Sequence, residues 1–213
     1  MTAICIICEG STEVEFVKKC LVPYLVNHGR SAYPIPIQAP SGNHRGGRVT
    51  VERLAKFISH QYRSGNRITT LVDFYGFQDA NGRSCEELQE NIRLAVKQCT
   101  TGADDRFLLP YVQKHEFEAL LFTDVSKFEN VVLDGWNKDR HNKLAAIRAQ
   151  FSNPEDINNS RETAPSKRIL NIFNDGTYNK VEHGSIIAQD IGIDAIRAAC
   201  PRFNAWVGKL KQW

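Results

Sequence analysis

The sequence predicts an α/β fold, with a mainly parallel sheet, helices on both of its faces and a C-terminal helical elaboration. The first half of the chain alternates apolar runs of strand length with segments whose apolar residues recur at helical spacing. Repeated strand–helix units of this length are typical of parallel sheets. We expect one domain, in which residues 1–123 form the α/β core and residues 124–213 are mainly helical.

The first strand–helix unit begins with residues 3–8, a continuous apolar run that is typical of a strand covered on both faces. The run stops at Glu9-Gly10. Thr12 and Glu15 then match the capping-box pattern of a helix start, so Glu15 is predicted to be a helix cap. The apolar face of this helix is predicted to be Val14, Val17, Leu21 and Leu25.

Three further strands are predicted along the chain. The proline-rich segment 33–40 predicts an edge strand, because proline cannot donate a hydrogen bond to a neighbouring strand. Residues 68–73 and 107–112 predict two more strands. Helices are expected between these strands, with the apolar residues Val51, Leu54, Phe57, Ile58 and Tyr62 in the first and Leu88, Ile92, Ala95 and Val96 in the second.

Composition and charge narrow the classes of function. The 213 residues are 42% hydrophobic and 24% charged, which is typical of globular proteins. The sequence has neither an apolar run of the roughly 18 residues that span a bilayer nor a signal-peptide pattern, so a cytoplasmic protein with no membrane partner is expected. The net charge of +3 does not by itself indicate a polyanion. The basic residues within 161–211 form either a phosphate-binding face or a solvated surface.

The six cysteines are dispersed, and one pair, Cys5 and Cys8, has C-x-x-C spacing. Strand residues three apart point to opposite faces, so this pair could not share a metal ion. We therefore expect buried, reduced thiols.

Carboxylates are found where the predicted strands end. Glu9 follows the first strand, Asp73 ends the third, and Glu116 and Glu118 follow the fourth. Ligands of open α/β sheets bind at this carboxyl edge. A single acid there could instead cap a helix, but several together repel one another unless a cation lies between them. Oxygen ligands without His or Cys clusters favour Mg²⁺ or Mn²⁺ over zinc.

Several motifs carry a resemblance to a known fold. Glu9-Gly-Ser-Thr-Glu13 and Leu71-Val-Asp73 resemble the Toprim domain of topoisomerases, primases and OLD-family nucleases, and the E-G-x-T-E form is most similar to the OLD side. Three further stretches resemble a family of small Toprim-like proteins of unknown function: Asp73-Phe-Tyr-Gly76, His115–Phe122 and Glu162–Arg168. The resemblance spans most of the chain.

The resemblance implies roles for the acids. Glu9 matches a Toprim glutamate that serves as metal ligand or general base, and Asp73 matches the first acid of a D-x-D motif. Tyr75 stands where the second acid of that motif would be, and tyrosine is a poor Mg²⁺ ligand. Glu116 or Glu118 is expected to replace it. In a helix these two side chains would diverge by about 200°, so only one should face the site.

Further residues follow from the same resemblance. Glu13 matches the second acid of E-G-x-T-E and is a further metal-ligand candidate. Lys167 resembles a lysine that OLD-type nucleases place near their metals, where a cation would stabilise charge on a scissile phosphate; the alternative is an ordinary surface lysine. Arg168 is a candidate for contacting phosphate. Arg45 and Arg48 lie in a glycine-rich segment that either touches nucleic-acid phosphates or is only a loop.

The leading hypothesis is a Mg²⁺- or Mn²⁺-dependent nuclease that hydrolyses DNA or RNA. OLD-type relatives carry an ATPase domain in the same chain, whereas this sequence has no nucleotide P-loop. The resemblance therefore implies a separate ATPase partner in a phage-defence system, and it leaves a homodimer open. The alternatives are a non-catalytic Toprim-like adaptor that binds an ATPase or nucleic acid, and primase-like nucleotidyl transfer.

Overall fold

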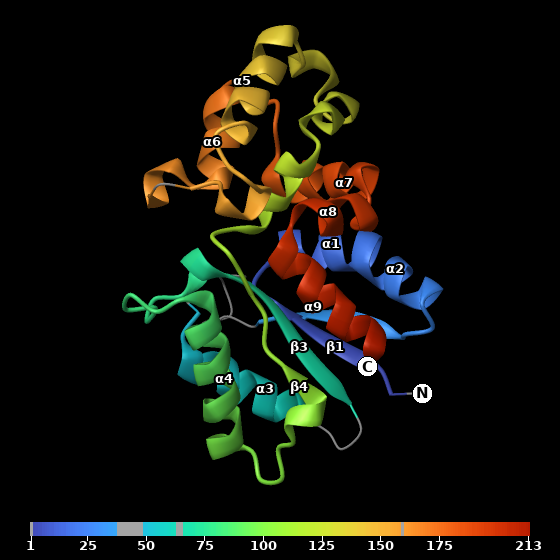
Figure 1. Cartoon of the computed structure of the whole chain (residues 1–213), viewed down its shortest axis with the longest axis vertical. Coiled ribbons are helices and arrows are strands. Elements are labelled where there is room, and N and C mark those ends of the chain that lie inside the picture. The colour runs from blue at the N-terminus through green and yellow to red at the C-terminus, as the bar shows by residue number, and fades with distance from the viewer. Residues whose placement is uncertain (1, 38–48, 63–65, 159) are drawn as a thin grey trace.

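The computed structural model describes residues 2–37, 49–62, 66–158 and 160–213. Within these ranges the chain forms a parallel sheet with the strand order β2-β1-β3-β4, and the short strand β5 pairs with β3 further along (Figure 1). The proline-containing strand β2 lies at an edge, as predicted. The strand bounds are Ile4–Cys8 (β1), Ala32–Pro36 (β2), Arg67–Asp73 (β3), Leu108–Leu109 (β4) and Val112–Gln113 (β5).

Strand β1 lies between β2 and β3 in the sheet and is buried on both faces. Ile4, Ile6 and Cys8 join the hydrophobic core on one face of the sheet, while Cys5 and Ile7 join the core on the other face. Both thiols are buried and free, so the predicted reduced cysteines on opposite faces are confirmed. The continuous apolar run thus reflects a strand that is covered twice.

Helices cover both faces of the sheet, which confirms the predicted fold class (Figure 1). Helices α3 (Val51–Gln61) and α4 (Cys85–Cys99) contribute to one core. The other core is built from α1 (Ser11–Phe16), α2 (Val22–Asn27), α7 (Lys180–Ile191), α8 (Ile193–Ala199) and α9 (Pro201–Gln212). Helices α5 (Lys138–Arg148) and α6 (Pro165–Ile172) lie beyond the carboxyl ends of the strands. Across the described ranges, no helix is long and apolar enough to cross a membrane.

The start of α1 differs from the prediction. Its N-cap is Gly10 rather than Thr12, and the Glu13 carboxylate accepts a hydrogen bond from the Gly10 N–H at 2.9 Å. The predicted cap Glu15 instead pairs with Lys18 at 3.2 Å on the outside of the helix. The assignment of the cap to Glu15 was wrong because the helix begins almost directly after the strand, so the N-cap lies two residues earlier in the chain than predicted.

The predicted fourth strand is interrupted at Pro110, which has no N–H to donate. Threonine hydroxyls on β3 replace the missing strand contacts. Thr70 Oγ1 accepts from the Tyr111 N–H at 2.8 Å and donates to the Tyr111 C=O at 2.7 Å. Thr69 Oγ1 donates to the Leu109 C=O at 2.6 Å. These hydrogen bonds hold the residues on both sides of Pro110 against β3, so the chain stays aligned with this strand up to the site.

Replacing Thr70 by valine should destabilise the protein. The substitution keeps the side-chain shape but leaves the buried Tyr111 N–H without its partner, which should lower the free energy of unfolding by about 1–3 kcal/mol. Urea denaturation followed by circular dichroism measures this loss. The matched control Thr101→Val, at an exposed position, should change stability by less than about 0.5 kcal/mol. Equal losses in the two variants would contradict this account of the interrupted strand.

Candidate metal and phosphate site

The site begins where β1 and β3 end side by side. The Glu9 N–H donates to the Leu71 C=O at 3.3 Å, which extends the strand pairing by one residue. The Glu9 carboxylate then accepts from the Asp73 N–H at 3.2 Å, so the side chain lies across the end of the neighbouring strand. The two acids that the sequence places at separate strand ends are therefore joined by a direct hydrogen bond.

Gly76 leaves room for the Glu9 carboxylate. The 3₁₀ turn Phe74–Gly76 follows β3 and passes directly against this side chain. A Cβ atom on Gly76 would lie 2.6 Å from Glu9 Oε1 and closer still to Oε2. Any other residue here would force the carboxylate to move, so the glycine of the Asp73-Phe-Tyr-Gly76 motif has a steric role in the site.

Glu116 and Glu118 take different places because the chain after β5 is extended at Glu116 and then forms the 3₁₀ helix Phe117–Thr123. The Glu116 carboxylate accepts from the Ser166 N–H in the first turn of α6 at 2.9 Å. Glu118 is completely buried. The structure thus separates the two acids that the sequence leaves as alternatives, and only Glu116 lines the cavity at the sheet edge.

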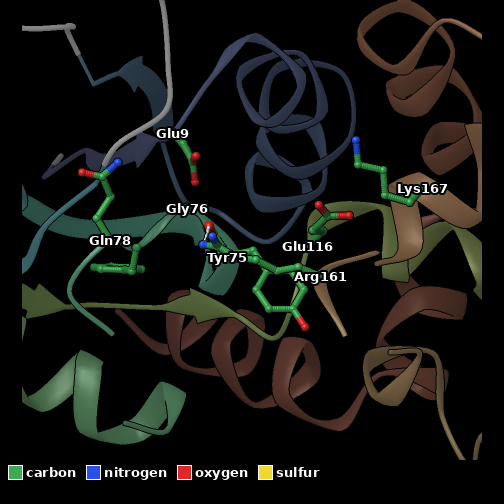
Figure 2. Close-up of a pocket in the computed structure, with 8 residues that line it drawn as sticks. Glu9, Tyr75, Gly76, Gln78, Glu116, Arg161 and Lys167 are labelled. Carbon is green, nitrogen blue, oxygen red and sulfur yellow. Dashed lines mark hydrogen bonds between the residues drawn. The ribbon is translucent and has the colours of Figure 1, made fainter. Parts of the chain in front are cut away.

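A cavity of about 650 Å³ lies at this edge of the sheet (Figure 2). It brings together three residues predicted from the sequence, Glu9, Glu116 and Lys167, which come from the end of β1, the segment after β5 and helix α6. Figure 2 shows both carboxylates at the cavity, with Lys167 on the α6 side. The full lining consists of Glu9, Tyr75, Gly76, Phe77, Gln78, Glu116, Arg161 and Lys167.

Tyr75 replaces an acid in the D-x-D pattern and is held by several neighbours. Its hydroxyl is hydrogen-bonded to Asn158 Nδ2, which is 3.3 Å from His115 Nδ1. Arg161 donates to the Tyr75 C=O at 2.8 Å, and its guanidinium lies over the tyrosine ring. Burial, with a smaller effect of Lys114, lowers the pKa of His115 to about 4. The imidazole is therefore neutral at pH 7, and its contacts with Asn158 and the Tyr75 ring indicate a structural role.

Two residues of the site carry no strong sequence signal. Arg161 lines the cavity, and Lys180 lies behind it with its Nζ 3.1 Å from Glu118 Oε1. In the sequence both appear only as members of the basic C-terminal stretch. Lys180 is the first residue of α7, far along the chain from every acid that it approaches. The fold brings it there by packing α7 against α1.

The predicted phosphate contact Arg168 does not line the cavity. Arg168 Nε donates to the Thr163 C=O at 2.7 Å, and its guanidinium lies over the Phe151 ring. These contacts direct the side chain toward Thr163 and Phe151 rather than toward the cavity. Arg45 and Arg48 lie outside the described residues.

The acids at the sheet edge raise one another's affinity for protons. Burial, and then the charge of Glu13, raise the pKa of Glu9 to about 7. Burial, and then Glu13 and Glu9, raise the pKa of Asp73 well above its ordinary range. Burial also raises the pKa of Glu118 to about 7 although Lys180 opposes this. Burial first, and then repulsion between the acids, thus oppose the charged forms of these side chains, which favours binding of a proton or a cation at neutral pH.

The acids fit a metal site that is completed by water and substrate phosphate better than a site made only of protein ligands. Among the described residues, no group of three or more His, Cys, Asp and Glu side chains is arranged to hold a metal ion. A cage made only of protein ligands therefore does not fit. Mg²⁺, however, usually keeps several waters and uses one or two carboxylates together with substrate phosphates. The pair Glu9 and Glu116, which lines one cavity with Lys167 and Arg161, fits that pattern.

The parallel sheet with acids at its carboxyl edge agrees with the fold that the resemblance to the Toprim domain implies. Residues 8–211 match a family model, and the chain belongs to this family, which is described as a domain of unknown function (DUF4276). No curated protein matches the sequence significantly.

Solved structures of similar fold come from OLD proteins. The C-terminal region of the Burkholderia pseudomallei OLD protein has a TM-score of 0.50 and 12% identity, and the alignment covers 99% of each chain. The C-terminal region of the Xanthomonas campestris pv. campestris OLD protein has a TM-score of 0.44 and 13% identity, over 98% of this chain and 95% of that one. At this identity the first likeness shows the fold alone, and it confirms the expected relation to the OLD fold.

Glu9→Gln should stabilise the metal-free protein at high pH. Because the pKa of Glu9 rises from 4.5 to about 7 on folding, its contribution to stability is fully present below pH 4.5 and is lost as the pH rises through 7. In EDTA, the variant should gain on the order of 1–3 kcal/mol of unfolding free energy at pH 8 and little at pH 4.5. Urea denaturation at both pH values measures the difference.

The control for this prediction is Glu15→Gln. The Glu15 pKa is lowered by hydrogen bonding to Lys18, so neutralising it should bring no gain at pH 8. A Glu9→Gln variant that is equally or less stable than the wild type at pH 8 would contradict the charge repulsion inferred for the site.

Proposed function

We propose that the protein is a Mg²⁺- or Mn²⁺-dependent nuclease that hydrolyses phosphodiester bonds in DNA or RNA. The observation that carries the proposal is the pairing of two carboxylates, Glu9 and Glu116, with two cations, Lys167 and Arg161, in one cavity. Carboxylates attract a divalent ion, and basic side chains attract phosphate oxygens. A cavity that combines both suits a phosphate ester bound next to a metal ion.

The carboxylates that would hold the ion are Glu9 and Glu116. When bound, Mg²⁺ or Mn²⁺ supplies a Lewis acid for the phosphoryl oxygen and lowers the pKa of a bound water. Asp73 lies behind this pair, and its carboxylate accepts from the Phe117 N–H at 2.9 Å. This hydrogen bond connects the end of β3 to the segment that presents Glu116, so Asp73 fixes the spacing of the pair. The Glu13 carboxylate accepts from the Gly10 N–H and so holds the backbone directly after Glu9.

The basic residues would act on the phosphate. The ammonium of Lys167 and the guanidinium of Arg161 face the same cavity as the acids. There they would neutralise charge that builds on the phosphoryl oxygens as water attacks phosphorus and the ester bond breaks. Lys167 is well placed for this role because α6 starts at Pro165, two residues before it, which fixes the first turn of the helix beside Glu116.

Glu9 has two candidate roles, metal ligand and general base. As a base it would accept a proton from the attacking water, and a pKa of about 7 suits proton transfer at neutral pH. As a ligand it would bind the ion in its charged form and release its proton to solvent. The two roles make different predictions for the same substitution, because a base can be removed without loss of the ion, whereas a ligand cannot.

An ATPase on a separate chain completes the proposal. It is supported by the resemblance to OLD-type nucleases, in which ATPase and Toprim parts belong to one chain, and by the fold that this chain shares with the C-terminal region of an OLD protein. We propose that the two chains cooperate on nucleic acid in defence against phage. A non-catalytic adaptor is the second candidate, favoured by Tyr75 in the place of an acid and by the lack of a preformed three-acid cluster in the described ranges.

Metal binding should depend on the acids at the strand ends. Isothermal titration with Mn²⁺ at pH 8 should show binding to the wild type that Glu9→Gln and Asp73→Asn each abolish, because each removes a charge at the ends of β1 and β3. Glu15→Gln, on the outside of α1, should bind like the wild type. Mn²⁺ binding that survives both substitutions would refute the metal site. If only Glu9→Gln retains binding but loses cleavage, Glu9 is the base.

Cleavage should be sensitive to Gly76. Plasmid, single-stranded DNA and RNA are incubated with the protein, Mn²⁺ and the cognate ATPase. Gly76→Ala should lower the cleavage rate by roughly 100-fold, because its methyl group displaces the Glu9 carboxylate. The control Gly208→Ala, where a Cβ would meet no described atom within 4 Å, should cleave like the wild type.

Three outcomes decide between the candidate functions. Equal rates for Gly76→Ala and the wild type would contradict the role assigned to Glu9. No cleavage of any substrate by the wild type would favour the adaptor. Release of pyrophosphate from nucleotides would favour primase-like transfer.

A further inference from the structure

Arg161 is held at the cavity by Tyr75 and not by an acid. Its Nη2 group donates to the Tyr75 C=O at 2.8 Å, and its guanidinium lies over the tyrosine ring, 5.7 Å from the ring centroid. Both residues line the cavity at the sheet edge (Figure 2). A carbonyl oxygen and the face of an aromatic ring attract a cation without cancelling its charge. The guanidinium therefore keeps its full positive charge at the cavity.

Arg161 differs in this respect from other arginines. In the parts of the chain that the structure describes, no carboxylate forms an ion pair with it. By contrast, ion pairs with Asp or Glu neutralise Arg93, Arg106, Arg140, Arg197 and Arg202. The bond to Tyr75 uses one of the five N–H groups of the guanidinium. Because such a planar group binds phosphate oxygens through parallel hydrogen bonds, Arg161 is suited to an anion from outside the chain.

Tyr75 is itself fixed in place. Its hydroxyl is hydrogen-bonded to Asn158 Nδ2, and its N–H donates to the His115 C=O at 3.2 Å. The centroids of the tyrosine and imidazole rings are 5.5 Å apart. Figure 2 shows the tyrosine hydroxyl directed away from the carboxylates of Glu9 and Glu116. The side chain is thus anchored at its backbone and at its hydroxyl, and it presents its ring to the guanidinium.

Tyrosine at position 75 has a different effect from the acid of the D-x-D pattern. A carboxylate so close to Arg161 would form a charge-assisted pair with the guanidinium and occupy its N–H groups. The tyrosine ring and C=O hold the same guanidinium and leave most of its N–H groups to a ligand. The residue that cannot serve as a metal ligand is therefore suited to support a phosphate-binding group.

We propose that Tyr75 is a positioning residue for Arg161. It holds the guanidinium at the cavity, where this group binds a phosphodiester of nucleic acid without the help of a divalent ion. Tyr75 itself does not touch the phosphate. The identity of the bound anion rests on the proposed function, whereas the support of Arg161 by Tyr75 does not.

The test measures binding of a short fluorescein-labelled single strand by fluorescence anisotropy, with DNA and RNA probes in separate arms. EDTA and low salt are used, so that no metal ion contributes and phosphate contacts are strong. Arg161→Gln should weaken binding by about 10- to 100-fold, because it removes charged hydrogen bonds to phosphate. It should also make the dependence of affinity on salt less steep, by about 0.7 in the logarithmic slope, since one phosphate contact is lost.

The Tyr75 variants test whether the ring acts through Arg161. Tyr75→Leu should weaken binding roughly fivefold, which is the size of a partly exposed cation–π contact, and should also reduce the salt slope. Tyr75→Phe keeps the ring and the C=O and should retain most of the affinity. In an Arg161→Gln background, Tyr75→Leu should cause no further loss. Tyr75→Met takes the place of Tyr75→Leu if circular dichroism shows that the leucine variant does not fold.

The matched control is another arginine that lies over an aromatic ring. The Arg106 guanidinium lies 5.7 Å from the centroid of the Phe107 ring and pairs with Asp104. These residues come directly before β4 and therefore lie at the opposite, amino edge of the sheet. Arg106→Gln and Phe107→Leu should both bind the probes within about twofold of the wild type, because exposed charges far from the cavity are screened.

The proposal is overturned if Tyr75→Leu binds like the wild type, if the double variant binds more weakly than Arg161→Gln, or if the wild type binds neither probe. Failure of the proposed function gives a different result. A wild type that binds in EDTA but never cleaves with Mn²⁺ refutes the nuclease and leaves the role of Tyr75 standing. Cleavage by a protein whose Tyr75→Leu variant binds normally refutes only the role of Tyr75.

Discussion

The hydrogen bond from the Asp73 N–H to the Glu9 carboxylate is the contact on which the rest of the site depends. It joins the ends of two neighbouring parallel strands through a side chain, where backbone pairing stops. Gly76 makes it possible, because only a residue without Cβ lets the chain after β3 pass so close to Glu9. The Asp73 carboxylate continues the connection to Phe117, and Glu116 is thereby placed at the same cavity.

This arrangement brings several carboxylates close together in a buried place. Acids from three segments lie close enough to raise one another's pKa, and burial removes the water that would screen them. Backbone N–H groups that each donate a hydrogen bond to one carboxylate, and the ammonium of Lys180, compensate part of this charge. The two carboxylates that face the cavity, Glu9 and Glu116, lie next to the cations Lys167 and Arg161. Such a site suits a cation bound together with a phosphate.

The strands and the acids at their ends could be predicted from the sequence, because strand ends are local features. The apolar run before Glu9 and the run before Asp73 define strands of a parallel sheet, and topology alone then brings the two acids to one edge. The helix cap could not be assigned reliably, since Glu13 and Glu15 both follow suitable residues and only the length of the turn at Gly10 decides between them. Lys180 was missed for a different reason: its partners are far away in sequence, and it lies on a helix whose packing no local pattern reveals.

The central claim is that the carboxyl edge of the sheet binds one divalent ion between Glu9 and Glu116. The most direct measurement is anomalous diffraction from a crystal soaked in Mn²⁺, because the signal locates the ion and its ligands without assuming an activity. The account predicts one peak in the cavity, within bonding distance of both carboxylates, with Lys180 Nζ still beside Glu118. No peak in the cavity, or a peak out of bonding distance of both carboxylates, would contradict it.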